Sequence, residues 1–331
     1  MKTILVTGAT GFLGKRICKD LLERGYVVVA QGRNKRIGKE LEQIGCRFFC
    51  IDLRDDLRDL TKGIDCIIHS AALSSPWGKK EDFLNINYYG TQKLLRSAIK
   101  NNVKRFIYIS STSVYFNFND RLNIKESDSV AKSSPSLYTQ TKLMAENEIL
   151  DRSSDIETII LRPRGIFGPY DTTLIPRLVI AHDKGKLAII GKEDTLVDVT
   201  YVGNVSHASI LAITSDKNSI GEIYNITNGE PVKIWEMIDF ILTSLGRELN
   251  KKIIPYRIVS CFAYLSELYC SLPFIKTEPV LTRYTAGLLA KSQTLNISKA
   301  EKKLNYKPIK DMNDALKETI DWYIEEIDNG S

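Results

Sequence analysis

"VTGATGFLGKRI", from Val6 to Ile17, places glycines at positions 8, 11 and 14 directly after a short apolar run. A glycine after a strand permits a tight turn with positive φ, a second lets the backbone approach a pyrophosphate, and a third lets the next helix pack closely on the sheet. The N-terminus of that helix offers N–H groups to phosphates. The alternative is a plain glycine-rich turn. We predict a dinucleotide-binding turn formed by Gly8, Thr10, Gly11, Phe12, Leu13 and Gly14.

The rest of the first half alternates short apolar runs with helical patterns. Continuous apolar strands between helices are typical of a parallel sheet that is covered on both faces. The pattern therefore predicts an α/β Rossmann fold, a doubly wound parallel sheet with helices on both faces. The predicted strands are 2–7, 26–32, 47–52, 66–72, 105–111 and 158–163, and the predicted helices are 11–25, 81–102 and 135–150.

The pattern changes after about Gly168, where strands shorten and helices dominate. We predict an NADP(H)-binding Rossmann domain with the catalytic residues over 1–170. A smaller C-terminal α+β substrate-binding lobe is predicted over 171–331, with some chain returning to the first domain. The stretch Ile258–Ile275 is strongly apolar but contains Glu267 and Pro273. It predicts a buried or lid helix rather than a membrane span, and the alternative is peripheral contact with a membrane surface.

Composition narrows the class of protein. The 331 residues carry a net charge of +6 with dispersed lysines and arginines, which disfavours nucleic acid as a partner. Six scattered cysteines without a Cys-x-x-Cys pair indicate a reducing compartment, and the N-terminus does not resemble a signal peptide, so we expect a cytoplasmic protein. The three histidines lie far apart in sequence, and no metal site is predicted.

The end of the second predicted strand bears on the choice of dinucleotide. An NAD site needs an acid there to hold the ribose hydroxyls. This chain has Gln31 and Gly32, followed by Arg33. A guanidinium pairs with a 2′-phosphate, which a carboxylate would repel. We predict NADP(H) as the preferred cofactor, with Arg33 as a cofactor residue, and NAD(H) is the alternative if Arg33 is only a solvated loop residue.

Three side chains are candidates for the chemistry. Ser111 lies in "YISSTSVY" at the end of the fifth predicted strand, and Tyr138 and Lys142 lie four residues apart on the next predicted helix, where they share a face. Reduction of a ketone needs a hydride and a proton. An ammonium beside a phenol favours the phenolate, which otherwise forms near pH ~10. We predict Tyr138 as the general acid, Lys142 as its partner and Ser111 as the hydrogen-bond donor to the substrate oxygen.

The order and spacing of these motifs resemble the extended short-chain dehydrogenase/reductase superfamily. The resemblance rests on "TGATGFLG", "SSTSVY", Tyr-x-x-x-Lys, "HSAA" at His69–Ala72 and "NYYGT" at Asn87–Thr91. It implies a catalytic Ser111 and a homodimer formed by the helices around Asn87 and Tyr138. Residues that the resemblance places against the cofactor are Asp52, Leu53, Ser70, Ala71, Ala72, Asn87, Tyr138, Lys142, Pro163 and Gly165.

The second half resembles one subfamily within this group. Nucleotide-sugar epimerases and dehydratases usually carry an arginine for the diphosphate where "LVDVTYVGNV" has Val197. That substitution disfavours a nucleotide-sugar enzyme, which stays the alternative. "VDVTYVGNV", "RPRGIFGPYDTTLIPRL" and "YNITNGEPVKIWEMI" resemble 3β-hydroxysteroid dehydrogenase-like proteins, including sterol-4α-carboxylate 3-dehydrogenases and bacterial 2-alkyl-3-oxoalkanoate reductases.

The resemblance implies an NAD(P)-dependent oxidoreductase that interconverts a 3-keto and a 3β-hydroxy group on a small, hydrophobic substrate. Trp77 is a substrate candidate, and Arg164 and Arg177 are candidates to meet a carboxylate. A non-catalytic nucleotide sensor or scaffold on the same fold is a third hypothesis. Proteins of that kind usually lose the Tyr-Lys pair, which this chain keeps.

Overall fold

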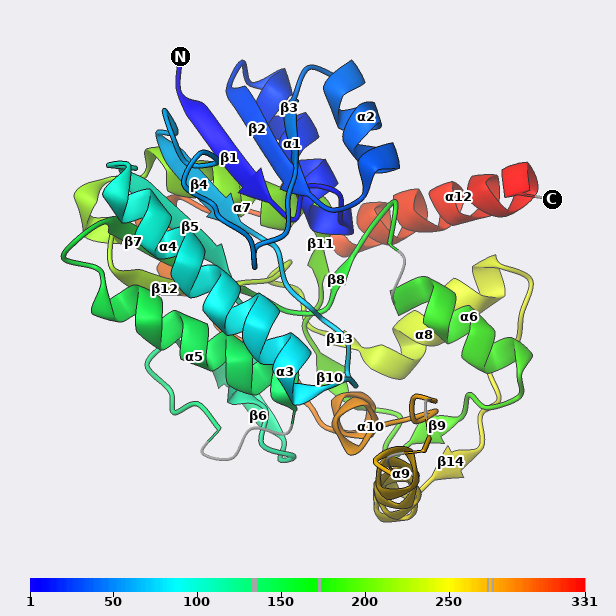
Figure 1. The fold of residues 1–331 in the computed structure, drawn as a ribbon. Coiled ribbons are helices and arrows are strands. Elements are labelled where there is room, and N and C mark those ends of the chain that lie inside the picture. The colour runs from blue at the N-terminus through cyan, green and yellow to red at the C-terminus, as the bar shows by residue number, and fades with distance from the viewer. Residues whose placement is uncertain (132–135, 172–173, 273, 276, 331) are drawn as a thin grey trace.

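The centre of the molecule is a seven-stranded parallel sheet in the order β12-β7-β5-β4-β1-β2-β3 (Figure 1). The computed structural model describes residues 1–131, 136–171, 174–272, 274–275 and 277–330. The order reverses between β1 and β4, where a doubly wound sheet binds its ligands. The predicted fold class is confirmed. The strands are β1 (Thr3–Thr7), β2 (Val27–Gly32), β3 (Arg47–Cys50), β4 (Cys66–His69), β5 (Arg105–Ile109), β7 (Glu157–Pro163) and β12 (Glu222–Ile226).

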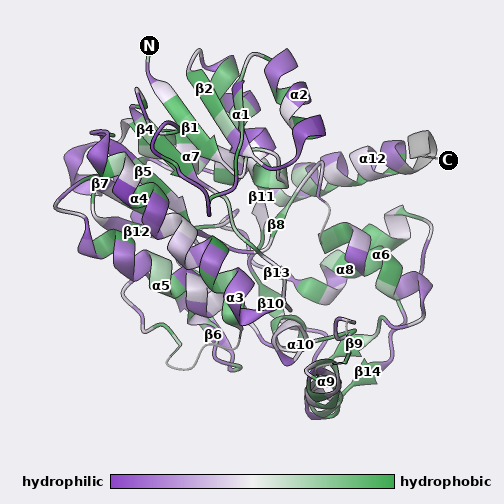
Figure 2. Cartoon of the chain, viewed as in Figure 1, coloured by the Kyte–Doolittle hydropathy of each residue, from purple (hydrophilic) through white to green (hydrophobic). Residues whose placement is uncertain are grey.

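Figure 2 shows hydrophobic residues along the central strands. Helices cover both faces of the sheet, and each face has its own buried core. On one face lie α1 (Phe12–Glu23), α2 (Lys35–Gln43), α7 (Val202–Thr214) and α11 (Ser298–Leu304). On the other lie α4 (Gly90–Lys100) and α5 (Leu137–Asp151). Each helix turns a stripe of apolar side chains toward the sheet, as Ile17 and Leu21 do from α1 and Leu94 and Ala98 do from α4.

The helix predicted over 81–102 contains a π-helical segment. It runs as α3 (Lys80–Phe83), η1 (Leu84–Tyr89) and α4 without a break. A wider turn of this kind is often found at functional sites. Here it contains Asn87, whose side chain is buried. The Asn87 amide donates to Leu73 O at 3.1 Å and to Thr141 Oγ1 at 3.1 Å, and its Oδ1 accepts from Leu73 N at 2.7 Å. Asn87 therefore ties the loop after β4 to α5.

The second half of the chain adds strands to both parts of the molecule. Strand β12 completes the large sheet by pairing with β7, and β6 (Arg121–Ile124) from the first half pairs with β15 (Gln293–Leu295) in a four-stranded sheet. The division at residues 170 and 171 stays a prediction. The remaining elements are η2 (Thr112–Tyr115), β8 (Ile166–Phe167), α6 (Leu174–Asp183), β9 (Ile189–Ile190), β10 (Leu196–Val197), β11 (Thr200–Tyr201), η3 (Lys217–Ser219), β13 (Val232–Lys233), α8 (Ile234–Ser244), β14 (Ile253–Ile254), α9 (Tyr256–Cys270), α10 (Arg283–Ala290) and α12 (Met312–Gly330).

Most of α9 lies within the apolar stretch Ile258–Ile275, for which the sequence predicts a buried or lid helix. The prediction of a buried helix is wrong, and a lid helix stays a prediction. Only Ala263 and Cys270 of α9 are buried. The helix carries apolar residues around most of its circumference, and α10 packs against it. Pro273 lies outside the described residues. Within the described parts of the chain, no helix is both long and apolar enough to cross a bilayer. Large side chains exposed on and just after α9 are Ile258, Phe262, Tyr264, Leu265, Leu268, Tyr269, Leu272 and Phe274.

Candidate active site

The predicted dinucleotide turn joins β1 to α1. Gly8 has φ +66°, and a Cβ there would lie 2.7 Å from Ala71 Cα. A Cβ on Gly14 would lie 2.2 Å from Gly8 O, so the helix packs against the turn only because this residue is glycine. α1 begins at Phe12, directly after Gly11. The turn and the helix N-terminus thus fit the pyrophosphate of a dinucleotide, as the spacing of the glycines predicts.

At the end of β2, the residue in place of an acid has a structural role. Gln31 is buried, accepts from Gly8 N at 3.1 Å and donates to Ile51 O at 2.5 Å. Arg33 is 65% exposed and its Nη1 lies 3.5 Å from Asp52 Oδ2. Asp52 also binds the Arg54 guanidinium at 2.9 Å, and this contact lowers the Asp52 pKa. The end of β2 is thus rich in guanidinium groups, and its nearest carboxylate is already paired.

The segment after β4 is tied to the glycine turn. Ser70 Oγ donates to Thr7 O at 2.7 Å, and Ala71 N donates to Thr7 Oγ1 at 3.3 Å. His69 is buried between two threonines, with Nδ1 2.6 Å from Thr7 Oγ1 and Nε2 2.8 Å from Thr91 Oγ1. Burial lowers the pKa of His69 to about 3, with a further contribution from the positive charge of Lys142. His69 is therefore a neutral structural residue that aligns β1, β4 and α4.

Ser111, Tyr138 and Lys142 come together at the carboxyl end of β5. Ser111 caps η2, and its Oγ accepts from Ser113 N at 3.1 Å. Ser136 caps α5, and its Oγ accepts from Thr139 N at 3.2 Å, so Tyr138 lies on the first turn and Lys142 on the next. Burial raises the pKa of Tyr138, and a hydrogen bond with the Ser111 side chain partly opposes this. The three residues predicted from the sequence thus form one cluster.

The charge of Lys142 differs from the sequence-based expectation. The side chain is 2% exposed, and its Nζ donates to Ile109 O at 2.6 Å and lies 6.0 Å from the centre of the Tyr138 ring. Burial lowers the pKa of Lys142 to about 7, although Glu146 opposes the shift. The expected lowering of the Tyr138 pKa is wrong for this structure, because burial penalises both the phenolate and the ammonium.

This burial predicts how stability depends on pH. Because the folded-state pKa of Lys142 lies below its unfolded value, the folded state carries the penalty of a buried charge at low pH, and the penalty fades as pH rises above about 7. The free energy of unfolding of the wild type minus that of Lys142→Met should rise by about 2 kcal/mol between about pH 7 and 9. Urea unfolding at stepped pH measures it. Lys19→Met, an exposed position on α1, should show no such trend. A difference that stays flat with pH would contradict the prediction.

Sequence analysis missed a buried ion pair behind the catalytic cluster. Arg162 Nε donates to Glu146 Oε1 at 2.9 Å, and its Nη2 contacts the other carboxylate oxygen. Arg162 Nη1 also donates to the Tyr115 hydroxyl at 2.6 Å, and that hydroxyl donates to Asn225 Oδ1 at 3.0 Å. Glu146 continues the four-residue spacing of Tyr138 and Lys142 along α5. That spacing is the signal that could have identified it.

The substrate candidates lie in different surroundings. Trp77 is partly exposed in the loop after β4. Arg177 is exposed on α6, whereas Arg164 is buried directly after Pro163, the last residue of β7.

Two of the predicted cofactor residues lie at tight points of the backbone. Gly165, which follows Arg164, has φ +48°. Leu53 is buried against Gly90, where a Cβ would lie 3.1 Å from the Leu53 Cβ.

A second tyrosine beside the cluster was not predicted. Tyr284, on the first turn of α10, lies beside the hydroxyls of Ser113 and Thr139. Burial raises the Tyr284 pKa, and the charge of Arg164 and the two hydroxyls oppose this shift. The nearby Tyr284 is also among the groups that raise the Tyr138 pKa. No local pattern links position 284 to the catalytic helix, because the contact forms only in three dimensions.

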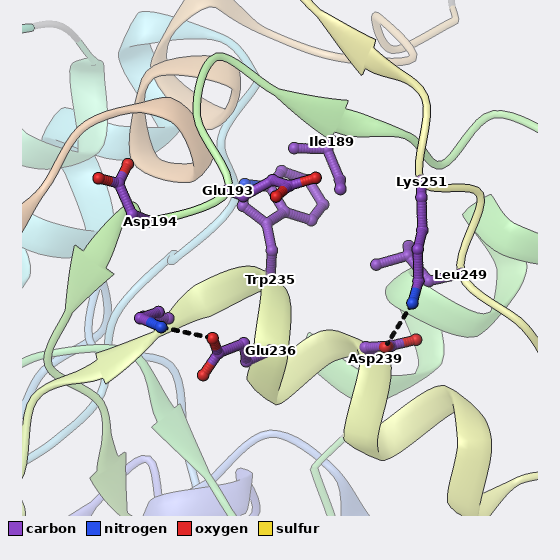
Figure 3. Close-up of a pocket in the computed structure, with 9 residues that line it drawn as sticks. Ile189, Glu193, Asp194, Trp235, Glu236, Asp239, Leu249 and Lys251 are labelled. Atoms are coloured by element: carbon purple, nitrogen blue, oxygen red, sulfur yellow. Dashed lines mark hydrogen bonds and ion pairs between the residues drawn. The ribbon is translucent and has the colours of Figure 1, made fainter.

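A pocket of about 280 Å³ lies away from the catalytic cluster, between α8 and the strands β9 and β14 (Figure 3). Its lining contains none of the predicted site residues. Lys233 pairs there with Glu236 at 2.6 Å and Lys251 with Asp239 at 3.8 Å. A wall with this many charges does not suit a hydrophobic substrate. The lining residues are Ile189, Glu193, Asp194, Lys233, Trp235, Glu236, Asp239, Leu249 and Lys251.

Known proteins resemble this chain over nearly its whole length. The model of the 3-beta hydroxysteroid dehydrogenase/isomerase family matches residues 5–256. Sterol-4-alpha-carboxylate 3-dehydrogenase, decarboxylating, of Mus musculus is 34% identical over 96% of this chain and 90% of that protein. The 2-alkyl-3-oxoalkanoate reductase of Stenotrophomonas maltophilia is 30% identical over 95% and 97%. The crystal structure of UDP-glucuronic acid 4-epimerase from Bacillus cereus in complex with NAD has a TM-score of 0.78 at 25% identity, covering 99% and 98%.

Proposed function

Because the chain belongs to the 3-beta hydroxysteroid dehydrogenase/isomerase family, we propose that it interconverts a 3-keto and a 3β-hydroxy group on a hydrophobic substrate, using NADP(H). The family membership confirms the resemblance inferred from the motifs. The similar proteins include dehydrogenases and reductases, so the chain is an oxidoreductase of this type. The substrate, the preference for NADP(H) and the roles of single residues belong to the proposal.

One observation carries the proposal: a phenol, an ammonium and a hydroxyl gather at the strand edge that also bears the glycine turn. A bound nicotinamide supplies or accepts the hydride. In reduction, the Tyr138 hydroxyl gives its proton to the carbonyl oxygen as charge develops there, and Ser111 donates a hydrogen bond to the same oxygen. In its protonated form, which burial disfavours above about pH 7, Lys142 places a positive charge 6.0 Å from the centre of the Tyr138 ring, where it would stabilise the phenolate left after proton transfer. Asn87, near this cluster, keeps the loop after β4 in place against α5.

Steady-state turnover tests this function. Purified protein is given NADPH with a 2-alkyl-3-oxo acid, and separately UDP-glucose. We expect NADPH oxidation with the keto acid and no conversion of the sugar nucleotide. The alternative, a nucleotide-sugar epimerase or dehydratase, predicts conversion of the sugar without net consumption of the cofactor. Val197 weighs against the alternative, because it is a buried apolar residue of β10 and cannot pair with a diphosphate.

Arg33 should set the cofactor preference. Its exposed guanidinium at the end of β2 suits the 2′-phosphate of NADP(H). Arg33→Ala should lower kcat/KM for NADPH by about 10- to 50-fold and leave that for NADH nearly unchanged. Initial rates with each cofactor measure it. Arg152→Ala, at an exposed arginine beyond α5, should change neither value. Equal effects on both cofactors, or a wild type that prefers NADH, would favour the NAD(H) alternative, which also fits similar structures that contain NAD.

Two further properties remain proposals. We propose a homodimer that forms through the outer surfaces of the helices around Asn87 and Tyr138, which light scattering can test. We also propose a cytoplasmic location. All six cysteines lie in the described part of the chain and are free thiols, which supports that location. The partner that we propose for the active site is a small hydrophobic molecule. Contact of α9 with a membrane surface stays an untested prediction.

A further inference from the structure

Two buried arginines near the end of β7 differ in how their charge is neutralised. Arg162 is paired with Glu146 through two nitrogens. Arg164 is also buried, at 7% exposure, but no carboxylate among the described residues lies within ion-pair distance of it. A buried guanidinium is costly unless it is paired and hydrogen-bonded. The contrast indicates that Arg164 is kept for an anion that comes from outside the chain.

Arg164 also lacks partners for some of its hydrogen-bond donors. Its backbone is fixed, because Arg164 N donates to Thr200 Oγ1 at 3.2 Å and that hydroxyl donates to Arg164 O at 2.6 Å. Its Nη1 donates to Gln293 Oε1. Among the described residues, the Arg164 Nε–H and the Gln293 side-chain NH₂ have no acceptor. Unsatisfied buried donors in a native fold require an explanation, and a bound group with acceptor oxygens would supply one.

Tyr284 links Arg164 to the catalytic phenol. The charge of Arg164 opposes the rise that burial causes in the pKa of Tyr284, and Tyr284 in turn contributes to the raised pKa of Tyr138. The Tyr284 ring packs edge-on against Phe116, with ring centres 5.8 Å apart. A Cβ on Gly287 would lie 2.8 Å from the Phe116 ring, so α10 lies tightly against the segment that follows η2. Tyr284 therefore has a fixed place near both Tyr138 and Arg164. Thr112, next to Ser111, donates to Pro163 O at 3.5 Å, so the segment that carries Arg164 also lies against the catalytic cluster.

We propose that Arg164, with Gln293 and the Tyr284 hydroxyl, is a receptor for a substrate carboxylate. The inference rests on the proposed function and assigns the residues that would hold the carboxylate of a 3-oxo or 3-hydroxy acid. In such an acid the carboxylate lies two carbons from the reacting carbon. When Tyr138 and Ser111 bind the substrate oxygen on carbon 3, the substrate carboxylate would lie at Tyr284 and Arg164. Charged hydrogen bonds from a guanidinium are strong, so this site would hold the keto group at the phenol.

The nearby Asp198 does not replace the external anion. It interacts electrostatically with Arg164 but makes no ion pair with it, and its Oδ2 accepts from Leu295 N at 2.7 Å. Burial raises the pKa of Asp198, although the hydrogen bond from Leu295 and the charge of Arg164 oppose the shift. Arg177, the other arginine proposed to meet a carboxylate, is exposed on α6. The geometry thus selects Arg164 from the two candidates.

A pair of substrates that differ only in charge tests the receptor. The holoenzyme with NADPH is given 3-oxodecanoate and its methyl ester. The wild type should prefer the acid. Arg164→Met should lower kcat/KM for the acid by about 100-fold and for the ester by less than about threefold. Tyr284→Phe should lower the acid value by about tenfold. Arg152→Met is the matched surface control and should leave both substrates unchanged.

Several outcomes would overturn the receptor without touching the proposed function. These are equal wild-type values for acid and ester, equal losses on both substrates in Arg164→Met, or loss of the acid preference in Arg177→Met alone. Arg164→Lys and Tyr284→Phe carry the test if Arg164→Met does not fold. Stabilisation of the NADPH complex by 3-oxodecanoate, read from its unfolding temperature, needs no turnover. If only the acid stabilises the complex, and Arg164→Lys and Tyr284→Phe weaken this effect, the receptor is supported even when the ketone is not reduced. Failure of reduction overturns only the proposed function.

Discussion

Tyr138→Phe should lower kcat for ketone reduction by about 10³-fold and leave the binding of NADPH within about twofold of the wild type. The variant removes one hydroxyl, which is the proton donor, and keeps the ring. Because the buried ring stays in place beside Ser111, removal of the hydroxyl should not unfold the protein. Stopped assays give kcat, and fluorescence titration gives the affinity for NADPH.

The matched control is Tyr89→Phe, at an exposed tyrosine of η1. It should retain wild-type kcat. Substantial activity in Tyr138→Phe would show that another group donates the proton, and Tyr284, the phenol beside it, would be the first alternative. A Tyr138→Phe/Tyr284→Phe double variant separates the two phenols.

Arg162→Met should lower the free energy of unfolding by about 3–5 kcal/mol, the largest loss of stability that we expect from one substitution here. Arg162 and Glu146 are both buried, at 3% and 1% exposure. Removing the guanidinium leaves a carboxylate in the interior without its partner. It also takes a hydrogen bond from the Tyr115 hydroxyl. Urea unfolding at neutral pH measures the loss.

The double variant Glu146→Leu/Arg162→Met distinguishes a lost pair from lost packing. It removes both charges and fills similar volume, so it should recover most of the stability that the single variant loses. A double variant as unstable as Arg162→Met would contradict the account, because the loss would then come from packing. Glu146 also opposes the pKa shift of Lys142, so the double variant should lower the pKa of that lysine further.

Local patterns were sufficient for six strands of the seven-stranded sheet and for the main candidate site, whereas β12 was not predicted. The glycine spacing at Gly8, Gly11 and Gly14 implies its turn because Gly8 has a positive φ and a Cβ on Gly11 or Gly14 would crowd Gly8 O, all within a few residues. The pair Tyr138 and Lys142 shares a helix, so its spacing alone places the two side chains on one face. Ser111 joins them because parallel strands end at one edge of the sheet.

Contacts between distant parts of the chain could not be predicted in the same way. Arg162 and Tyr115 are 47 residues apart, and Tyr284 meets the residues around Tyr138 from the other half of the chain. The π-helical segment contains Asn87, whose side chain bonds to Leu73 and Thr141 in other parts of the chain. The exposure of α9 depends on which distant parts of the chain pack against it, such as α10. Apolar composition alone gave the wrong answer there.

Transfer of deuterium from cofactor to substrate tests the central claim most directly. Protein is incubated with NADPH that carries deuterium at the reactive position of the nicotinamide, together with a 2-alkyl-3-oxo acid, and the product is analysed by mass spectrometry. Our account predicts a 3-hydroxy acid with one deuterium on carbon 3 and one NADP⁺ formed for each product molecule. A keto acid that stays unchanged, while UDP-glucose is converted without net loss of NADPH, would contradict the account.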